Sequence, residues 1–405
     1  MKKRKLKRKA KIILSLIVVV ILALLCATIY IKYENYQKEL KIKEIKKEKE
    51  RKKKEEEKLK PKKYSFKMIM VGDALIHNGV YMDAKEADGT YNFKKMLIHV
   101  KPIVKTYDIA YYNQETILGG TGLGLSSYPR FNSPQEVGDA FIDAGFNMVS
   151  LATNHTMDMG EKGVEASVAY WKTHPEVVSS GQWTSEEERN KVRIYEKNGI
   201  KYAFFSYTIW DNGLKTPEDK EYLNNMYSNE KAEKDISSVK DKVDAIIVAM
   251  HWGTEYSYGI DSKQVEIANY LSSLGVNLII GCHPHVVEPV EYINDNKTYV
   301  IYSLGNFISD QEGVGKNTGL MMEVTVNKVY DPKTKETKVT VDNPKAELVY
   351  TSANRKPVFH KNFTLYSYKD LNNDILPDYQ TYYEKYKEIV SSRQNDLVWG
   401  LSGEE

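Results

Sequence analysis

From Ser65 onward, short apolar runs alternate with amphipathic stretches along the chain. Several runs are rich in β-branched residues and are bounded by Gly or Asn, which is typical of buried strands. The predicted strands are Phe66–Gly72, Tyr107–Asn113, Asn147–Ala152, Tyr202–Tyr207, Ala245–Met250, Asn277–Gly281, Tyr299–Leu304 and Leu320–Val326. The predicted helices are Pro134–Ala144, Gly160–His174 and Lys263–Leu274. This alternation predicts an α/β fold with helices packed outside a sheet.

The first of these helices has clear boundary signals. Ser133, followed by Glu136 three residues later, predicts a capping box, and Pro134 suits the first turn. Gly145 is expected to end the helix. After about Val326 the pattern changes: an exposed hairpin arm is expected over 333–341, and an exposed helix or loosely held tail over 370–405.

The first 63 residues follow a different pattern. Residues 2–11 hold eight basic side chains, and the twenty residues from Ile12 to Ile31 carry no charge. At about 1.5 Å per residue, a helix of this length spans roughly 30 Å, the hydrocarbon thickness of a bilayer. The basic cluster predicts that the N-terminus stays in the cytoplasm. We therefore expect a cytoplasmic segment over 1–11, a single transmembrane anchor over 12–31, and the remaining chain outside the cell.

Two alternatives to an anchor have weaker support. A cleaved signal peptide has a shorter apolar region followed by an A-x-A site, and no good site of this kind follows here. A lipoprotein site would need a small residue before Cys26, where Leu25 stands. Residues 32–63, mostly Lys, Glu and Arg, cannot bury a core. They are expected to form a solvated stalk or exposed helix, or to bind an anionic surface or polymer.

Composition and charge narrow the function of the remainder. Of 405 residues, 41% are hydrophobic, which is enough for a large core, and two cysteines are too few for a disulfide scaffold. Residues 1–63 carry 23 basic and 8 acidic side chains, a net charge of +15; the other 342 carry 35 and 47, a net charge of −12. An acidic body argues against nucleic-acid binding. We expect a main domain over 64–330 and a C-terminal extension over 331–405.

Polar residues gather where the predicted strands end. In open α/β sheets, ligands bind at the carboxyl ends of the strands. Side chains suited to chemistry lie at or just past these ends: Asp73, His77, Glu115, Asn154, His155, His251, His283 and His285. In an extended His283-Pro-His285 segment, both imidazoles would project to the same side. Mixed oxygen and imidazole donors suit Zn, Mn, Fe or Co better than Ca.

The six residues Asp73, Glu115, Asn154, His251, His283 and His285 are expected to converge on one cleft, because parallel strands bring their ends to one edge. A two-metal hydrolytic site uses a carboxylate between metals about 3.5–4 Å apart. His155, beside Asn154, would assist proton transfer or stabilise charge in the same cleft. The side chains expected to line the walls of this cleft are Trp252, Pro284 and Phe307.

These motifs, in this order and spacing, resemble the CapA family of capsule-synthesis proteins. The matching segments are Val71–His77, Asn113–Glu115, Tyr128–Pro134, Val149–Gly160, His251–Glu255, Gly281–Val286 and Tyr302–Phe307. The resemblance covers about residues 66–326. The family includes membrane-anchored poly-γ-glutamate capsule proteins of the CapA and PgsA type. Its membership in the calcineurin-like metallophosphatase superfamily implies a four-layer α/β/β/α sandwich.

The resemblance also implies roles for individual residues. Asp73 would be the first metal carboxylate, Glu115 the bridging ligand and Asn154 a ligand of the second metal. His155 would be the adjacent catalytic histidine, acting with Asp73 and Asn154. The remaining metal ligands would be His251, His283 and His285, with His77 as a further candidate. The cofactors would be two divalent ions, Mn, Zn or Fe, and Arg130 could bind an anionic substrate.

Two functions fit this set of expectations. In the first, a membrane-anchored hydrolase at the outer face cleaves a phosphoester, or an amide bond of an anionic polymer. In the second, a non-catalytic membrane subunit tethers or helps to export such a polymer, and its metal site is structural. For both functions, the expected partners are the membrane, an anionic polymer or phosphoester, and a polymer-synthase complex.

Overall fold

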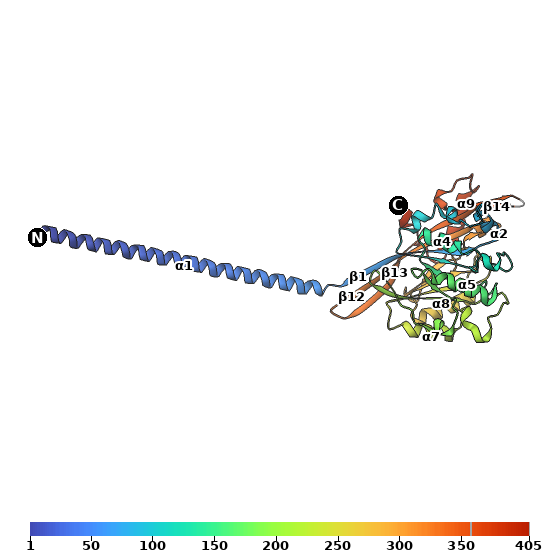
Figure 1. The fold of residues 1–405 in the computed structure, drawn as a ribbon, viewed down its shortest axis with the longest axis horizontal. Helices are drawn as coiled ribbons and strands as arrows, with labels where there is room; N and C mark the ends of the chain where they lie inside the picture. Colours follow the sequence, from blue (N-terminus) through green and yellow to red (C-terminus); the bar gives the residue numbers. More distant parts are fainter. Residues whose placement is uncertain (357–358, 405) are drawn as a thin grey trace. The chain divides into compact units, whose positions relative to one another are not determined.

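The computed structural model describes residues 1–356 and 359–404 (Figure 1). The chain divides into two compact units, Met1–Lys62 with Tyr330–Glu336, and Lys63–Val329 with Thr337–Glu405. In the first unit, helix α1 (Lys2–Lys58) has no buried residue and is long and apolar enough to cross a membrane. Beyond its apolar stretch, ion pairs three or four residues apart, such as Arg51 with Glu48, support the exposed turns. The candidate anchor and the predicted stalk therefore form one continuous helix.

The larger of two sheets has nine strands. Its strand order is β14 (Phe359–Ser367), β13 (Glu336–Lys356), β12 (Thr318–Asp331), β1 (Lys62–Leu75), β2 (Ile109–Asn113), β3 (Met148–Ser150) and β4 (Val178–Ser180). Two short strands complete it: β11 (Asn306–Ser309) pairs with β1, and β15 (Val398–Trp399) pairs with β13. Strands β1 to β4 run parallel. Their carboxyl ends consequently point to the same edge.

The second sheet has six strands in the order β5 (Tyr195–Lys197), β6 (Ile200–Thr208), β7 (Ala245–His251), β8 (Leu278–Cys282), β10 (Thr298–Ile301) and β9 (Val290–Ile293). The four central strands are parallel, and the edge strands β5 and β9 are antiparallel to their neighbours. The parallel strands are nearly continuous apolar runs, as expected for strands covered on both faces.

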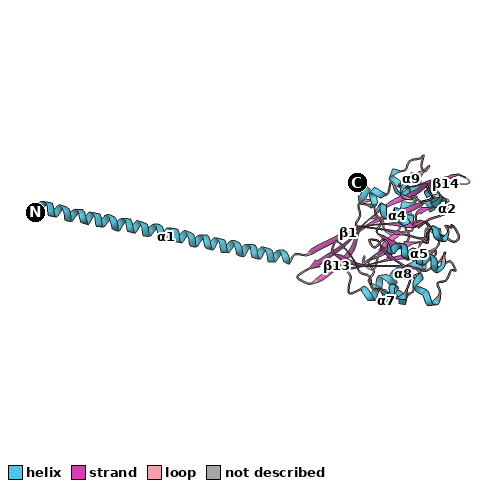
Figure 2. Cartoon of the chain, viewed as in Figure 1, coloured by secondary structure: helices cyan, strands magenta, loops and turns pink. Residues whose placement is uncertain are grey.

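The α-helices that follow α1 are α2 (Asn78–Ala84), α3 (Lys101–Val104), α4 (Glu136–Ala144), α5 (Gly160–Lys172), α6 (Glu186–Asn190), α7 (Asn229–Val239), α8 (Ser262–Leu274) and α9 (Tyr379–Ser391). Short 3-10 turns lie at Lys94–Leu97, Thr121–Leu123, Glu218–Leu223, Val314–Asn317, Tyr368–Asp370 and Ser402–Glu404. Helices cover both outer faces of the paired sheets (Figure 2).

Three apolar clusters hold these layers together. Between the sheets, Met68 and Met70 of β1 pack with Ile247 of β7. The alternate residues of β1 face outward and pack against helices that include α4, while the outer face of the second sheet packs against α7 and α8. Because successive side chains of a strand face opposite ways, each sheet supplies two apolar faces. The predicted four-layer α/β/β/α sandwich is confirmed.

Every predicted strand and helix overlaps an observed one, but the predicted capping box at Ser133 was wrong. Ser133 does not cap α4, because its hydroxyl lies 2.8 Å from the Thr116 hydroxyl and Gln135 occupies the N-cap. Gly145 does end that helix, with φ of 110°. The capping box lies instead at α8, between Asp261 and Gln264.

The C-terminal segment is not a loosely held tail. Helix α9 does form there, but its Tyr386 and Val390 are buried in the cluster between the sheets. Farther along, β15 pairs with β13, and Leu401 is buried with the outer cluster of the larger sheet. The sequence of this segment is rich in Tyr, Asp and Lys, so its few core positions are not visible as a periodic apolar pattern.

Candidate metal centre

The strand ends bring the polar residues together at one edge. Asp73 of β1 lies in register with Asn113 of β2 on one side and with Asn306 of β11 on the other. The register of β1 is irregular around Asp73, as is common where a side chain is aimed into a site. A Cβ at Gly72 would lie 1.8 Å from the Gly305 carbonyl oxygen, so only glycine permits this approach.

The segment that carries His283 and His285 is bent, which corrects the prediction of an extended segment. His283 has φ of 103° and His285 has φ of 61°, values that are uncommon for residues other than glycine. Such strained conformations persist only where the surroundings fix them, and they cluster at functional sites. Both imidazoles nevertheless reach the same cluster, because the bends turn them toward it.

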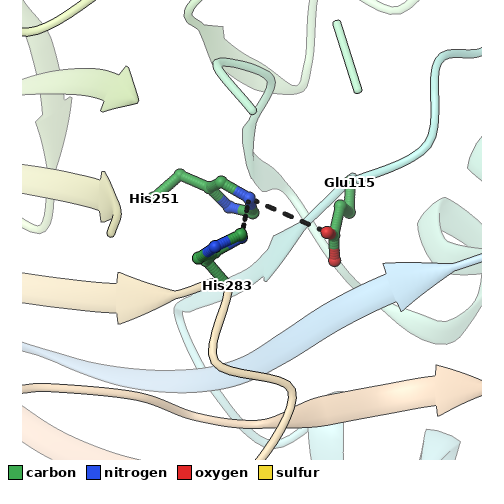
Figure 3. Close-up of side chains that lie close together, drawn as sticks. All are labelled: Glu115, His251 and His283. Atoms are coloured by element: carbon green, nitrogen blue, oxygen red, sulfur yellow. Dashed lines mark hydrogen bonds and ion pairs between the residues drawn. The ribbon is translucent and has the colours of Figure 1, made fainter. Parts of the chain in front are cut away.

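One half of the cluster centres on His251, at the end of β7 (Figure 3). Its Nε2 lies 2.9 Å from Asn154 Oδ1, 3.1 Å from His283 Nδ1 and 3.7 Å from Glu115 Oε1. An imidazole nitrogen, an amide oxygen and a carboxylate oxygen therefore surround a second imidazole nitrogen. This half combines the donor types that bind Zn or Mn.

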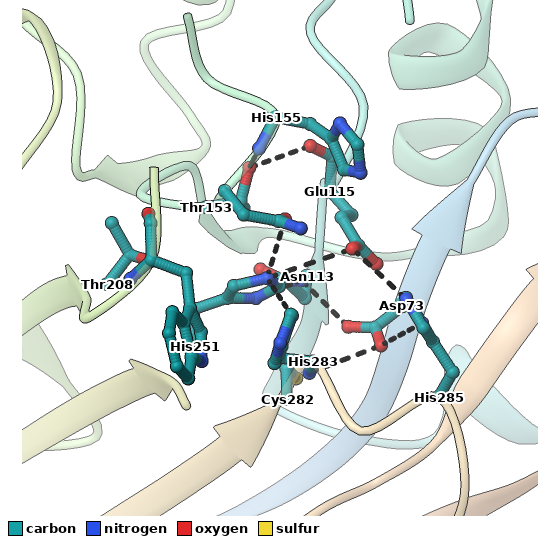
Figure 4. A network of polar contacts seen from close by, with 12 residues as sticks. Asp73, Asn113, Glu115, Thr153, His155, Thr208, His251, Cys282, His283 and His285 are labelled. Carbon is teal, nitrogen blue, oxygen red and sulfur yellow. Dashed lines mark hydrogen bonds and ion pairs between the residues drawn. The ribbon is translucent and has the colours of Figure 1, made fainter. Parts of the chain in front are cut away.

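The other half centres on Asp73 and His285 (Figure 4). Asp73 Oδ2 lies 3.4 Å from His285 Nδ1, and Glu115 Oε1 lies 3.6 Å from His285 Nε2. The amide nitrogen of Asn113 donates to Asp73 Oδ1 at 2.8 Å and so fixes the orientation of this carboxylate.

Three sets of donors lie close enough to hold an ion, with ligand atoms within 4.8 Å of one another. They are Glu115 with His251 and His283, Asp73 with Glu115 and His285, and Glu255 with His283 and His285. Glu115 belongs to the first two sets and therefore lies between the two halves of the cluster.

The burial and the pKa shifts of these side chains also indicate a metal site. Both carboxylate oxygens of Glu115 are buried and have no hydrogen-bond partner among the described residues. Burial, together with the neighbouring carboxylate of Asp73, raises the pKa of Glu115 well above its usual value. Burial lowers the pKa of His251 and His283, which keeps both imidazoles neutral, as metal ligation requires. A buried carboxylate without a donor, among neutral imidazoles, fits a divalent cation.

His155 lies beside this cluster and has its own partner. Its Nδ1 lies 2.7 Å from Asp158 Oδ2, which also accepts the Phe131 backbone N–H at 2.6 Å. The Phe131 ring packs edge-on against the imidazole, with 4.7 Å between ring centroids. Asp158 therefore fixes the orientation of His155.

His77, the least certain candidate, is not in any of the three donor sets. Its Nδ1 lies 3.1 Å from the Leu75 carbonyl oxygen and 3.3 Å from the Asp310 amide nitrogen. Burial lowers its pKa to about 4, and its ring packs edge-on against Phe131. These contacts give His77 a structural environment beside the site.

A pocket of about 560 Å³ opens onto the cluster. It is lined by Leu75, Tyr128, Pro129, Arg130, Phe131, His155, Asn212, Leu214, Glu255, Tyr256 and His285. Arg130 is exposed at this pocket. Trp252 and Phe307 were predicted to line the cleft, and this was wrong. Trp252 is fully buried in the cluster under α7 and α8. Phe307 is fully buried in the cluster beside α4. Pro284 is also absent from the lining residues.

Sequence reasoning missed four residues of the site: Asn113, Asp158, Asn212 and Glu255. Asn113, Asp158 and Glu255 stand inside predicted motifs, so proximity to Glu115, His155 and His251 respectively was an available signal. Asn212 lies in the loop after β6, and its side chain accepts a hydrogen bond from Asn154 at 3.3 Å. The end of this strand carries no histidine, and its acidic residue Asp211 is not in the donor sets.

Fold and site together define an α/β/β/α sandwich with a candidate metal centre at its strand ends. The model of the family "Bacterial capsule synthesis protein PGA_cap" matches residues 67–311, and the chain belongs to this family. The resemblance drawn from the motifs is thus confirmed.

Similar proteins include two from Bacillus. The chain is 31% identical over 179 residues to the PGA biosynthesis protein CapA of Bacillus subtilis (strain 168), covering 42% of this chain and 44% of that protein. It is 27% identical over 255 residues to the capsule biosynthesis protein CapA of Bacillus anthracis, covering 60% of each. The matches thus span less than two thirds of either relative. A solved structure of the calcineurin-like phosphoesterase YfkN from Bacillus subtilis aligns with a TM-score of 0.39 and 15% identity, over 69% of this chain and 91% of that one.

Proposed function

We propose that this protein is a membrane-anchored, metal-dependent phosphoesterase that works in the synthesis or export of an anionic capsule polymer such as poly-γ-glutamate. The family and the names of the Bacillus relatives support the capsule context. The buried Glu115 carboxylate carries the chemical part of the proposal, because its oxygens lack donors and lie within 4 Å of two imidazoles. A cation is the simplest partner for such a group.

Two divalent ions, Mn, Zn or Fe, would be held by the two halves of the cluster. Glu115, His251, His283 and the Asn154 amide oxygen would hold one ion. Asp73, Glu115 and His285 would hold the other, and Glu255 is close enough to complete a shell. Bound ions would polarise the ester and supply an attacking hydroxide at neutral pH.

His155 would donate a proton to the leaving group. Asp158 accepts from Nδ1 of His155, so Nε2 of the protonated ring is available to donate to the leaving oxygen. The same carboxylate would stabilise the imidazolium form. Phe131 packs against the ring and limits its rotation.

Arg130 would bind the anionic group of the substrate at the mouth of the pocket. The body as a whole carries a net charge of −12, which repels polyanions at long range. Screening confines this repulsion to about 8–10 Å at ordinary ionic strength. A guanidinium and bound cations at the pocket would therefore make recognition local and dependent on metal.

The anchor would place the catalytic body at the outer face of the membrane. Helix α1 contains the uncharged stretch 12–31, and the basic cluster precedes it. Protease added to intact protoplasts should then digest the body and leave only the region near residues 1–31 protected. Full protection of the body would contradict this orientation.

The catalytic proposal is tested on the full-length chain in detergent. Wild type, Asp73→Asn and His283→Ala are compared for bound metal by elemental analysis, for phosphoester hydrolysis, and for folding by circular dichroism. We expect about two ions per chain and hydrolysis in wild type, with both lost in the folded variants. Metal-loaded wild type that hydrolyses no phosphoester would overturn the enzyme and favour a tethering or export role.

A further inference from the structure

Exposed aromatic side chains gather at the candidate site. Within residues 64–404, the described Phe, Tyr and Trp side chains that are exposed are Tyr128 (78%), Trp210 (44%) and Tyr256 (46%). Tyr128 and Tyr256 line the pocket, and the Trp210 ring lies 6.0 Å from the His283 ring, with 34° between their planes. Trp210 does not itself line this pocket, but Asn212 and Leu214 of the same loop do, so the three exposed rings lie at or beside one pocket. Exposed apolar side chains that gather beside polar groups mark binding sites.

Trp210 is 44% exposed and is held in place by two hydrogen bonds. Its indole Nε1 donates to the Gly253 carbonyl oxygen at 3.1 Å, and its backbone N–H donates to the Thr208 hydroxyl at 3.1 Å. Thr208 ends β6 in register with His251, and the two lie close together in Figure 4. The tryptophan is therefore positioned by the same strand ends that build the metal centre.

The loop after Trp210 connects this side chain to the catalytic groups. Asp211 closes a turn by accepting the backbone N–H of Gly213 at 2.9 Å, and its carbonyl oxygen accepts that of Leu214 at 2.8 Å. Asn212 in this turn accepts a hydrogen bond from Asn154 and lines the pocket together with Leu214. The loop is thus ordered by its own contacts before any ligand arrives.

Tyr256 plays a different role, because both of its faces have neighbours. The Lys316 ammonium lies 4.8 Å from the ring centroid, and the His285 ring lies 5.8 Å away. Tyr256 is therefore already in contact with a cation and an imidazole, although 46% of it stays exposed.

We propose that Trp210 is a stacking platform for a ring in the substrate, so that the group released from phosphate is cyclic and not an open chain. This inference rests on the proposed phosphoesterase function. A rigid indole offers a flat apolar face that a sugar or base ring can cover with little loss of conformational freedom, whereas an acyclic chain must first be ordered. The anionic end of the same substrate would lie at the metals and Arg130, and its ring would lie against Trp210.

The test uses the full-length chain in detergent, loaded with Mn²⁺, and isothermal titration calorimetry. The ligands are inorganic phosphate, ethyl phosphate, a hexose 1-phosphate and a nucleoside 5′-monophosphate. Wild type should bind at least one ring-bearing phosphate about fivefold to tenfold more tightly than ethyl phosphate, as expected for one aromatic contact. Whether the hexose or the nucleoside shows the larger preference identifies the ring.

Variants separate the platform from the metal site. Trp210→Ala should abolish the preference for a ring and leave the affinity for inorganic phosphate unchanged, while Trp210→Phe should keep part of the preference. Ile98→Ala, which removes an exposed apolar side chain that does not line the pocket, should leave all four affinities unchanged. Equal affinities for ring-bearing and acyclic phosphates in wild type, or a preference that survives in Trp210→Ala, would overturn the inference. Failure of metal-loaded wild type to bind inorganic phosphate would instead overturn the proposed function, and this inference with it.

Discussion

The candidate site has two halves that are built in different ways: the buried metal cluster at the strand ends and the open pocket in front of it. The half made of strand ends carries the imidazoles and carboxylates, and Asp73, Glu115 and His251 are each at most 1% exposed. The half made of loops carries Arg130 and Tyr128, and the latter is 78% exposed. Deep burial raises the cost of every unpaired charge, so the strand-end half needs a counter-ion, whereas the loop half is already solvated.

This difference assigns different tasks to the two halves. Strands and their register hold ligand atoms to within fractions of an ångström, which a metal site requires. Loops tolerate substitution and can change specificity without disturbing the scaffold. We therefore expect changes in the strand-end half to affect metal content and stability, and changes in the loop half to affect substrate recognition alone.

The largest effect should come from removing metal. A divalent ion that binds only the folded chain stabilises it by about 4 kcal/mol when the free ion concentration is a thousand times the dissociation constant. Chelation should lower the free energy of unfolding by this amount. Glu115→Gln should lose most of this response, because a neutral amide is a poor bridging ligand. Thermal and denaturant unfolding with and without EDTA measure this change in stability. Glu196→Gln, an exposed control, should respond as wild type does. An identical EDTA response in Glu115→Gln would separate Glu115 from the metal site.

Next in size is the effect of removing the partner of His155. Asp158→Asn should lower kcat by about a hundredfold, because the amide cannot stabilise the imidazolium form of the ring. Metal content should stay at the wild-type level, since Asp158 is in none of the three donor sets. Glu165→Gln on the exposed face of α5 is the matched control. An unchanged kcat in Asp158→Asn would remove His155 from the chemistry.

A smaller effect is expected in the loop half. Arg130→Ala should raise KM about tenfold while kcat changes little, because an exposed guanidinium contributes mainly to binding. Arg130→Lys should recover part of the affinity. Raising the salt concentration should narrow the difference between wild type and variant, since the site is open to solvent. A loss of kcat or of metal in Arg130→Ala would show that the two halves are not independent.

The strand-end half was largely predictable from sequence, whereas in the loop half only Arg130 and its segment Tyr128–Pro134 were predicted. Apolar β-branched runs locate the parallel strands, and parallel strands bring their ends together, so Asp73, His251 and the other predicted ligands could be placed at one edge. The backbone path between such points is set by tertiary contacts. His283 and His285 have positive φ values, and Gly281 just before them lies so close to the Tyr302 carbonyl oxygen that a Cβ would be 1.9 Å away. No apolar pattern in the sequence predicts either feature.

Side-chain direction after a strand was the other source of error. Trp252 follows the ligand His251 directly, yet its indole points into the opposite layer and donates to the Tyr302 carbonyl oxygen at 2.9 Å. Adjacent residues near a strand end face opposite sides, so one of such a pair belongs to the site and the other to the core. Asn212 and Trp210 lie on a loop whose position depends on contacts with β7, which no local pattern reveals.

The smallest effect should come from the contact that holds the Tyr256 wall. The Lys316 ammonium lies over its ring, and a half-exposed cation–π contact of this kind contributes about 0.5–1 kcal/mol. Lys316→Met should therefore lower the free energy of unfolding by no more than about 1 kcal/mol, because Gln311 still donates to the Tyr256 hydroxyl at 3.1 Å. Lys316→Arg, which keeps the cation, should match wild type in denaturant titrations. Metal content should be equal in all three proteins, and a loss of metal in Lys316→Met would mean that the loop half helps to shape the strand-end half.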